Sequence, residues 1–309
     1  MEDVPRQPSG PVAAAAGADI VILDGPLGTE LAARGIETPA PLWSAAALLD
    51  ARGCEVVRAI HRDHARAGAT VHTANTFRTR RRQAGAAWAE LAARAVSLAR
   101  EAVPPGHRVA GSIAPLEDCY RPDLSPADAR AEHRELARAL AAAGVDILLC
   151  ETFPHVGEAL VALEEAVATG VEAWASFTAG PEADLLSPED VEIAAREAAA
   201  RGARAVLVNC TPAARTLAYV ERLAACGAPF GAYANAGAPG EGLGWRAAPG
   251  GSAAARYADL ARGWIEAGAT IVGGCCGTGP EHVAALRALV DDDARAPARR
   301  RRRATGSPR

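Results

Sequence analysis

The order in which short apolar runs and alanine-rich segments follow each other constrains the fold of this chain more than any other feature. Eight β-branched or apolar runs end in a glycine or a small polar residue, and each precedes a segment typical of a helix. This alternation indicates parallel strands joined by crossover helices. The predicted strands are Asp19–Gly25, Thr70–Asn75, Arg108–Ala114, Asp146–Phe153, Glu172–Thr178, Ala205–Cys210, Phe230–Ala236 and Thr270–Cys276, and the helices lie near 44–67, 84–102, 126–143, 156–169, 188–201, 213–226, 252–267 and 280–290.

Eight strand–helix units in about 275 residues match a closed (β/α)8 TIM barrel. An open doubly wound sheet is the alternative, but no G-x-G-x-x-G pattern follows the first strand. We therefore predict a barrel over 18–290, a disordered N-terminal segment over 1–17, and a disordered arginine-rich tail over 291–309. Three residues followed by proline are predicted helix N-caps, namely Ser125, Ser187 and Thr211.

Composition excludes several classes of protein. A net charge of −4 argues against binding to nucleic acid or to a membrane surface, and no apolar stretch reaches membrane-spanning length. The sequence contains no lysine, which excludes Schiff-base chemistry through lysine. The seven cysteines are an odd number, and we expect no signal peptide ahead of them. We therefore expect a cytoplasmic protein whose clustered cysteines serve metal binding or catalysis.

Three cysteines lie at predicted strand ends. Cys210 ends the sixth strand, and Cys275 and Cys276 end the eighth, within the sequence IVGGCCGTGP. Because active sites of such barrels lie at the carboxyl ends of the strands, we expect the three sulfurs to converge there. Three thiolates suit Zn²⁺ and leave its fourth position open. Neighbouring strand residues point to opposite faces, so both adjacent cysteines reach one ion only if Gly274 and Gly277 allow a sharp turn.

Other candidate ligands carry weaker patterns. Cys54, Cys119, Cys150 and Cys226 are interpreted as small buried residues. His61 and His64 share one face of a helix in the outer ring, where the sequence shows no acidic or thiol partner, and we interpret them as surface or satisfied polar histidines. His155 follows the fourth strand, in a loop that could border the pocket.

The expected chemistry follows from the charge of the centre. A zinc ion with three thiolates is anionic overall and activates water poorly, but an incoming thiol can take the open position and remain a thiolate. Such a site favours alkyl transfer to a thiol substrate, since the thiolate is the nucleophile. Asp24 and Glu151 are predicted on the same rim, where either carboxylate could hold a substrate ammonium group.

The chain resembles the homocysteine S-methyltransferases from about Ile20 to Leu289. The resemblance rests on LDGPLGTEL, AGATVHTANTFR, VAGSIAPLEDCY, AGVDILLCETF, VNC, YANAG and IVGGCCGTGPEHVAAL. It implies zinc bound by Cys210, Cys275 and Cys276, homocysteine as acceptor, and methionine as product. It also implies substrate contacts at Asp24, Gly25, Thr29, Thr76, Glu151 and Asn235, with Asn235 beside the metal as a ligand when substrate is absent. Asn209, at the end of the sixth strand, is a further predicted substrate contact. Ala234 stands where the family often has proline.

The methyl donor is less well specified. Because no folate or cobalamin domain is expected, the resemblance implies a small sulfonium donor, S-methylmethionine or S-adenosylmethionine. The alternatives are a betaine-type donor, a separate methyl-cobalamin protein, another thiol acceptor, or a non-catalytic thiol or zinc sensor. Four aromatic residues, Trp43, Phe77, Phe153 and Tyr233, are candidates either for a wall around a cationic donor or for core packing.

Overall fold

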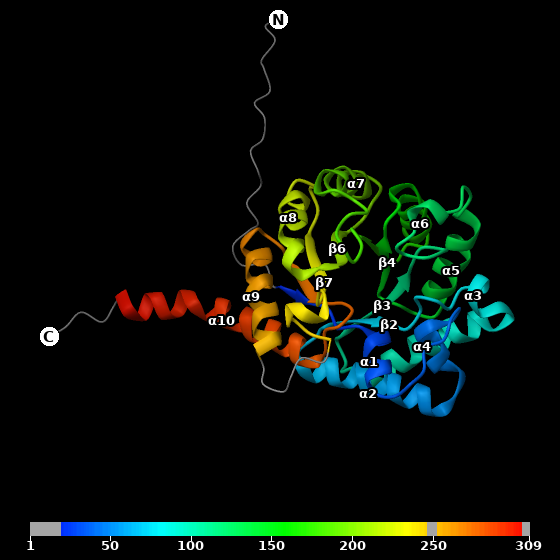
Figure 1. Cartoon of the computed structure of the whole chain (residues 1–309), viewed down its shortest axis with the longest axis horizontal. Coiled ribbons are helices and arrows are strands. Elements are labelled where there is room, and N and C mark those ends of the chain that lie inside the picture. Colours follow the sequence, from blue (N-terminus) through cyan, green and yellow to red (C-terminus); the bar gives the residue numbers. More distant parts are fainter. Residues whose placement is uncertain (1–19, 246–251, 305–309) are drawn as a thin grey trace, which may run out of the picture.

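The computed structural model describes residues 20–245 and 252–304, in which eight parallel strands form one sheet surrounded by helices (Figure 1). Hydrogen-bonded neighbours run in the order β1-β8-β7-β6-β5-β4-β3-β2. Leu23 pairs with Val71 and so joins β1 to β2, which closes the sheet. The predicted (β/α)8 barrel is confirmed. The strands are β1 (Val21–Ile22), β2 (Val71–Ala74), β3 (Arg108–Ile113), β4 (Ile147–Phe153), β5 (Glu172–Phe177), β6 (Ala205–Pro212), β7 (Phe230–Asn235) and β8 (Ile271–Gly274).

The helices follow the strands in the predicted order. They are α1 (Leu27–Ala33), α2 (Ala51–Ala67), α3 (Arg81–Ala84), α4 (Trp88–Ala102), α5 (Arg130–Ala142), α6 (Val156–Val167), α7 (Pro188–Ala200), α8 (Ala213–Leu223), α9 (Ser252–Glu266) and α10 (Pro280–Ala304). Short 3₁₀ segments are η1 (Trp43–Leu49), η2 (Gly85–Ala87), η3 (Pro122–Leu124) and η4 (Pro239–Glu241). Among the described residues, no helix combines the length and the apolar character needed to cross a bilayer.

Two hydrophobic clusters follow from the alternation of side chains along each strand. Leu23, Val71, Leu149 and Trp174 belong to a buried cluster inside the barrel. A larger cluster lies between the sheet and the helices, and Trp264 and Leu48 are both fully buried in it. Full burial of each large apolar side chain contributes about 1.5–3 kcal/mol. The interior is therefore packed, and polar residues concentrate at the carboxyl ends of the strands.

Several boundaries differ from those predicted. The helix expected over 44–67 is divided at Asp50, whose extended backbone and side chain cap α2 by accepting the Gly53 N–H at 2.8 Å. Ser187 caps α7 as predicted. Ser125 and Thr211 do not cap helices: Ser125 donates to Glu158 instead, and Thr211 lies inside β6.

The two predicted terminal segments have different outcomes. The segment 1–17 lies outside the described residues. We expected a disordered tail from residue 291, but α10 continues as helix to Ala304 and projects from the barrel (Figure 1). The alanine and arginine residues of this stretch have high helix propensity, which accounts for the continuation.

Candidate metal centre and substrate pocket

The structure brings the sulfurs of Cys210, Cys275 and Cys276 together at the carboxyl ends of β6 and β8. All three lie within 4.8 Å of one another, and those of Cys210 and Cys276 are 3.7 Å apart. Zinc–sulfur bonds of about 2.3 Å in a tetrahedron separate the sulfurs by about 3.8 Å. The three side chains thus fit a trigonal face for one ion with a fourth position free, and their donor type is that of a zinc site.

Irregular backbone at both strand ends produces this convergence. Cys210 has φ of 51°, a left-handed conformation that is uncommon outside glycine, at a bulge between Asn209 and Pro212. Such a conformation costs roughly 1–3 kcal/mol and is typical of functional sites. On the other strand, the expected turn is made by Gly277 with φ of 81°. Gly274 serves a different purpose, because a Cβ there would lie 2.3 Å from Thr278 Oγ1.

The three thiols share protons unequally. Hydrogen bonds from the thiols of Cys275 and Cys276 lower the pKa of Cys210 well below its ordinary value. The same hydrogen bonding to Cys210 raises the pKa values of Cys275 and Cys276. Each of these pKa shifts follows from the close contact between Cys210 and the other two sulfurs.

Sequence reasoning did not find Tyr120, whose hydroxyl lies 3.0 Å from the Cys210 sulfur. Cys119 is also near: burial first, and then the charge of Cys210, raise the pKa of Cys119 to about 12. Cys119 was interpreted as a small buried residue, and it is in fact half-buried next to the candidate site. Both residues lie in the loop after β3, where no periodicity indicates the direction of a side chain.

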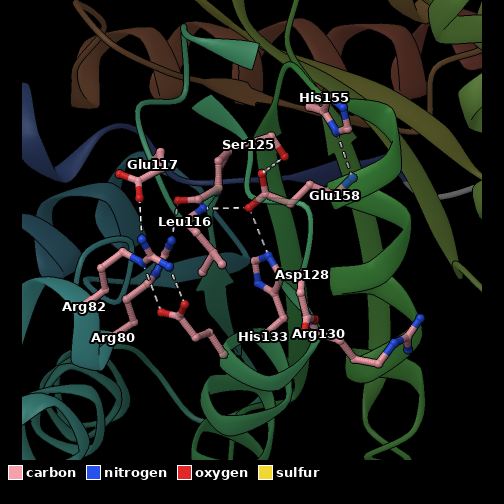
Figure 2. Close-up of polar contacts among 12 residues, drawn as sticks. Arg80, Arg82, Leu116, Glu117, Ser125, Asp128, Arg130, His133, His155 and Glu158 are labelled. Carbon is pink, nitrogen blue, oxygen red and sulfur yellow. Dashed lines mark hydrogen bonds and ion pairs between the residues drawn. The ribbon is translucent and has the colours of Figure 1, made fainter. Parts of the chain in front are cut away.

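A buried polar network holds this loop in place (Figure 2). Glu158 of α6 accepts hydrogen bonds from the Leu116 N–H at 2.7 Å and from Ser125 Oγ at 2.6 Å, and it contacts His133 Nε2 at 3.1 Å. The Arg80 guanidinium donates to the Pro115 carbonyl from the other side. Both ends of the loop are thereby fixed, which positions Tyr120 over the triad. His155 is exposed and caps α6, accepting the Glu158 N–H at 3.1 Å.

Glu151 is the buried carboxylate of the barrel mouth. It follows Leu149 on the inward face of β4, and its two oxygens accept from Ser112 Oγ at 2.5 Å and Tyr233 Oη at 2.8 Å. Burial raises the pKa of Glu151 to about 7, against the lowering effect of those two hydrogen bonds. An approaching ammonium group would favour its ionised form.

The Asp24 side chain was predicted on the rim of the barrel, but it points toward α2. Leu23 faces the barrel interior, so the next side chain points outward, and Asp24 is buried against α2 with its Oδ2 3.8 Å from His61 Nδ1. The same oxygen accepts the Thr73 N–H at 2.9 Å. Thr29, of α1, remains near the triad, because its Oγ1 accepts the Gly277 N–H at 3.3 Å.

The predicted substrate contacts at Thr76, Asn209 and Asn235 already have protein partners. Thr76 Oγ1 donates to the Ser112 carbonyl at 2.9 Å. Asn209 Oδ1 accepts from the Thr152 N–H and from Ser176 Oγ, and its amide donates to Thr152 Oγ1. Asn235 donates to the Cys210 carbonyl at 2.9 Å and accepts the N–H of Gly237. Asn209 and Asn235 therefore hold the backbone on either side of the triad.

The interpretation of the two α2 histidines as surface or satisfied polar residues is wrong. His61 and His64 are fully buried, and an acidic partner, Asp24, faces His61. A Cβ on Gly25 would lie 2.7 Å from His64 Nε2, so this glycine allows the first loop to approach α2 closely. The spacing that placed both histidines on one face of the helix was right, but that face packs on the sheet.

The four aromatic candidates fall into two groups. Phe153 is fully buried in the hydrophobic core, and Tyr233 donates to Glu151. Trp43 and Phe77 meet edge to face with ring centroids 5.6 Å apart. Another aromatic residue, Trp245, is 42 % exposed and borders a cavity of about 310 Å³ beside Asn235 and Pro212. Glu182, Glu241 and Arg215 also line this cavity.

The fold and the site define a class of protein, the (β/α)8 barrels with three thiols that converge at the carboxyl-terminal face. The homocysteine S-methyltransferase family profile matches residues 21–290, and the chain belongs to that family. It is 32 % identical to a homocysteine S-methyltransferase of Escherichia coli K12 over 87 % of this chain and 95 % of that protein. It is also 32 % identical to the homocysteine S-methyltransferase YbgG of Bacillus subtilis, over 87 % and 94 %.

The solved structures agree with this assignment. The metallated form of the homocysteine methyltransferase MmuM from Escherichia coli superposes with a TM-score of 0.72 at 29 % identity, over 87 % of this chain and 96 % of that one. The chain is therefore a homocysteine methyltransferase by family and by fold.

Proposed function

We propose that the chain transfers a methyl group from a small sulfonium compound, S-methylmethionine or S-adenosylmethionine, to the thiolate of homocysteine and so forms methionine. The observation that carries the proposal is the position of the three sulfurs beside a buried carboxylate and a cavity with acidic and aromatic lining. A zinc ion held by Cys210, Cys275 and Cys276 would keep an incoming thiol deprotonated near neutral pH, which is the chemistry that attack on a methyl group requires.

The chain's own residues supply binding and orientation. Glu151, once ionised, would pair with the ammonium group of homocysteine and fix the thiol toward the triad. Tyr120 would donate to the Cys210 sulfur and restrain its charge. In the transfer itself the new bond between sulfur and methyl forms as the bond between donor sulfur and methyl breaks, and the donor leaves as a neutral thioether.

The cavity beside Asn235 supports a donor that carries both a cation and a carboxylate. Trp245, Glu182 and Glu241 present a π-face and two negative charges, which would stabilise a sulfonium group. Arg215, on the same wall, would pair with the carboxylate of an amino-acid donor. We also propose a reducing, cytoplasmic setting for the protein, since all seven cysteines are free thiols.

A donor screen tests the proposal. The zinc-loaded full-length protein is incubated with homocysteine and one donor at a time, and methionine is quantified by mass spectrometry. We expect turnover with the sulfonium donors and little with glycine betaine or methylcobalamin. Turnover with betaine alone would replace the proposed donor by the betaine alternative.

Variants of the cavity test its role separately. Glu182→Gln with Glu241→Gln should raise KM for the sulfonium donor about 10-fold or more and leave KM for homocysteine unchanged, because charge-assisted contacts contribute about 1.5–3 kcal/mol. The exposed residue Glu221 on α8 provides the control, as Glu221→Gln. If both KM values moved together, the cavity would not be the donor site.

A further inference from the structure

A second group of potential metal ligands lies on the far side of the sheet from the barrel interior. Asp24 follows β1, His72 lies on β2, and His61 lies on α2 with its ring near both of the other side chains. One ligand atom from each of the three side chains lies within 4.8 Å of the other two, and none of the three residues is more than 4 % exposed. The mechanism proposed above uses neither histidine.

Three ring nitrogens of this group lack hydrogen-bond partners among the described residues. Both ring nitrogens of His61 and the Nδ1 of His72 are buried, with no hydrogen-bond partner among the described residues. A buried polar atom left unsatisfied costs about 1–3 kcal/mol, so three such atoms around one carboxylate require an explanation. Burial lowers the pKa values of both histidines to about 3, which keeps them in the neutral form that binds metals.

The surrounding contacts have the form of a metal site's outer shell. His72 Nε2 lies 3.0 Å from His107 Nδ1. This contact leaves the Nδ1 of His72 free to bind a metal, because a metal-binding histidine uses its other ring nitrogen for a hydrogen bond. Asp24 Oδ2 accepts the Thr73 N–H at 2.9 Å, which fixes the carboxylate. The rings of His61 and His72 are nearly perpendicular, at 79°, with centroids 6.3 Å apart, so they approach the space beside Asp24 from different directions.

We propose that Asp24, His61 and His72 bind a divalent transition-metal ion, separate from the ion of the three thiols. Two imidazoles and one carboxylate are a donor set for Zn²⁺, Fe²⁺, Co²⁺ or Ni²⁺. Ligand atoms around a tetrahedral ion with bonds of about 2.0–2.1 Å are about 3.3 Å apart. The 3.8 Å between Asp24 Oδ2 and His61 Nδ1 therefore needs only a small closure. The ion would tie β1, β2 and α2 together behind the loop that contains Gly25.

Cobalt binding to the full-length protein, stripped of metal and kept reduced, tests this site. We expect the native protein to take one equivalent of Co²⁺ at the thiols, with thiolate-to-cobalt charge-transfer absorption, and a second equivalent without it. Cys275→Ala with Cys276→Ala should remove the first and keep the second. His61→Gln with His72→Gln should remove the second and keep the first, and the exposed residue His155, as His155→Gln, serves as the control.

The role of His107 gives a graded readout. His107→Leu should weaken the second equivalent about 10- to 100-fold without moving the first, as loss of an outer-shell partner does. A native protein that takes only the thiol-bound equivalent would overturn the proposal, as would a second equivalent that survives the double histidine variant. Should that variant not fold, the double cysteine variant decides alone, because it must still bind Co²⁺ through nitrogen and oxygen.

Discussion

The Tyr120 hydroxyl lies 3.0 Å from the Cys210 sulfur, and it reaches there from a loop on the opposite wall of the barrel mouth. Among the described residues outside the triad, Tyr120 alone has a side chain that forms a hydrogen bond with one of the three sulfurs. It ties the candidate metal centre to the loop that the Glu158 network holds (Figure 2).

Tyr120→Phe removes that hydrogen bond and keeps the ring. We expect zinc affinity to fall about 10-fold or more, because outer-shell partners typically contribute 10- to 100-fold. Competition with a chromophoric chelator measures the change. Tyr219→Phe is the control, since Tyr219 donates to the Leu186 carbonyl at 3.0 Å, outside the site. Equal zinc affinities in the two variants would show that Tyr120 does not contribute to metal binding.

Cys275→Ala should abolish both metal binding at the thiols and methionine formation, because Cys210 and Cys276 alone provide only two of the three thiolate ligands. Loss of the thiolate-to-cobalt charge-transfer absorption in the cobalt-loaded variant and a turnover assay measure the two losses. Cys54→Ala should keep both, since Cys54 lies on α2, where it packs against the hydrophobic core and its thiol donates to the Leu48 carbonyl at 3.7 Å. A Cys275→Ala protein that still turned over would contradict the proposed mechanism.

Glu151 should give the enzyme a pH dependence near neutrality. Its pKa of about 7 means that the carboxylate gains a proton as the pH falls through that value and can no longer pair with an ammonium group. We expect kcat/KM for homocysteine to fall on the acid side. Glu151→Gln should lack this ionisation and lose roughly 10- to 100-fold in kcat/KM at pH 8. The difference between the two profiles separates Glu151 from the substrate's own groups.

The same residue has a consequence for stability. The pKa of Glu151 is higher in the folded chain than its ordinary value of 4.5, so the folded state binds more protons between about 4.5 and about 7. The free energy of unfolding of the wild type should therefore decrease as the pH rises through this window. Urea denaturation of Glu151→Gln should show a smaller decrease, whereas Glu221→Gln should follow the wild type.

Asn209→Ala should destabilise the barrel, although Asn209 contributes no sulfur to the triad. It leaves the Thr152 N–H and Ser176 Oγ without their acceptor, and each buried group left unpaired costs about 1–3 kcal/mol. Thr152 has φ of 62°, and that conformation depends on being held. We expect the free energy of unfolding to fall by about 2–4 kcal/mol in urea denaturation. The exposed residue Ser97, as Ser97→Ala, is the control.

The fold could be predicted from the sequence because the strands and helices of a barrel have strong periodic patterns. Reading the last residue of each strand also located Cys210, Cys275 and Cys276, since every parallel strand ends at the same face. The convergence itself depends on a left-handed Cys210, and no residue type indicates such a conformation at a cysteine.

The remaining residues could not be found from local patterns. Tyr120 lies in a loop, where a side chain's direction depends on contacts with β6 and α6, far away in the sequence. His61 lies on a helix whose periodicity shows that two histidines share a face, but not that this face covers Asp24. Asn209 and Asp24 were predicted to contact the substrate, while the structure gives their polar atoms protein partners.

The barrel is closed between β1 and β2 by a single pair of residues. Within residues 20–245 and 252–304, the pairing of Leu23 with Val71 alone joins β1 to β2, with the Asp24 N–H donating to the Val71 carbonyl and the Thr70 N–H to that of Ile22. In hydrogen–deuterium exchange, those two amides should lose protection before the amides shared by β6 and β7. This seam is where we expect the cylinder to breathe, and the buried imidazoles of α2 lie directly over it.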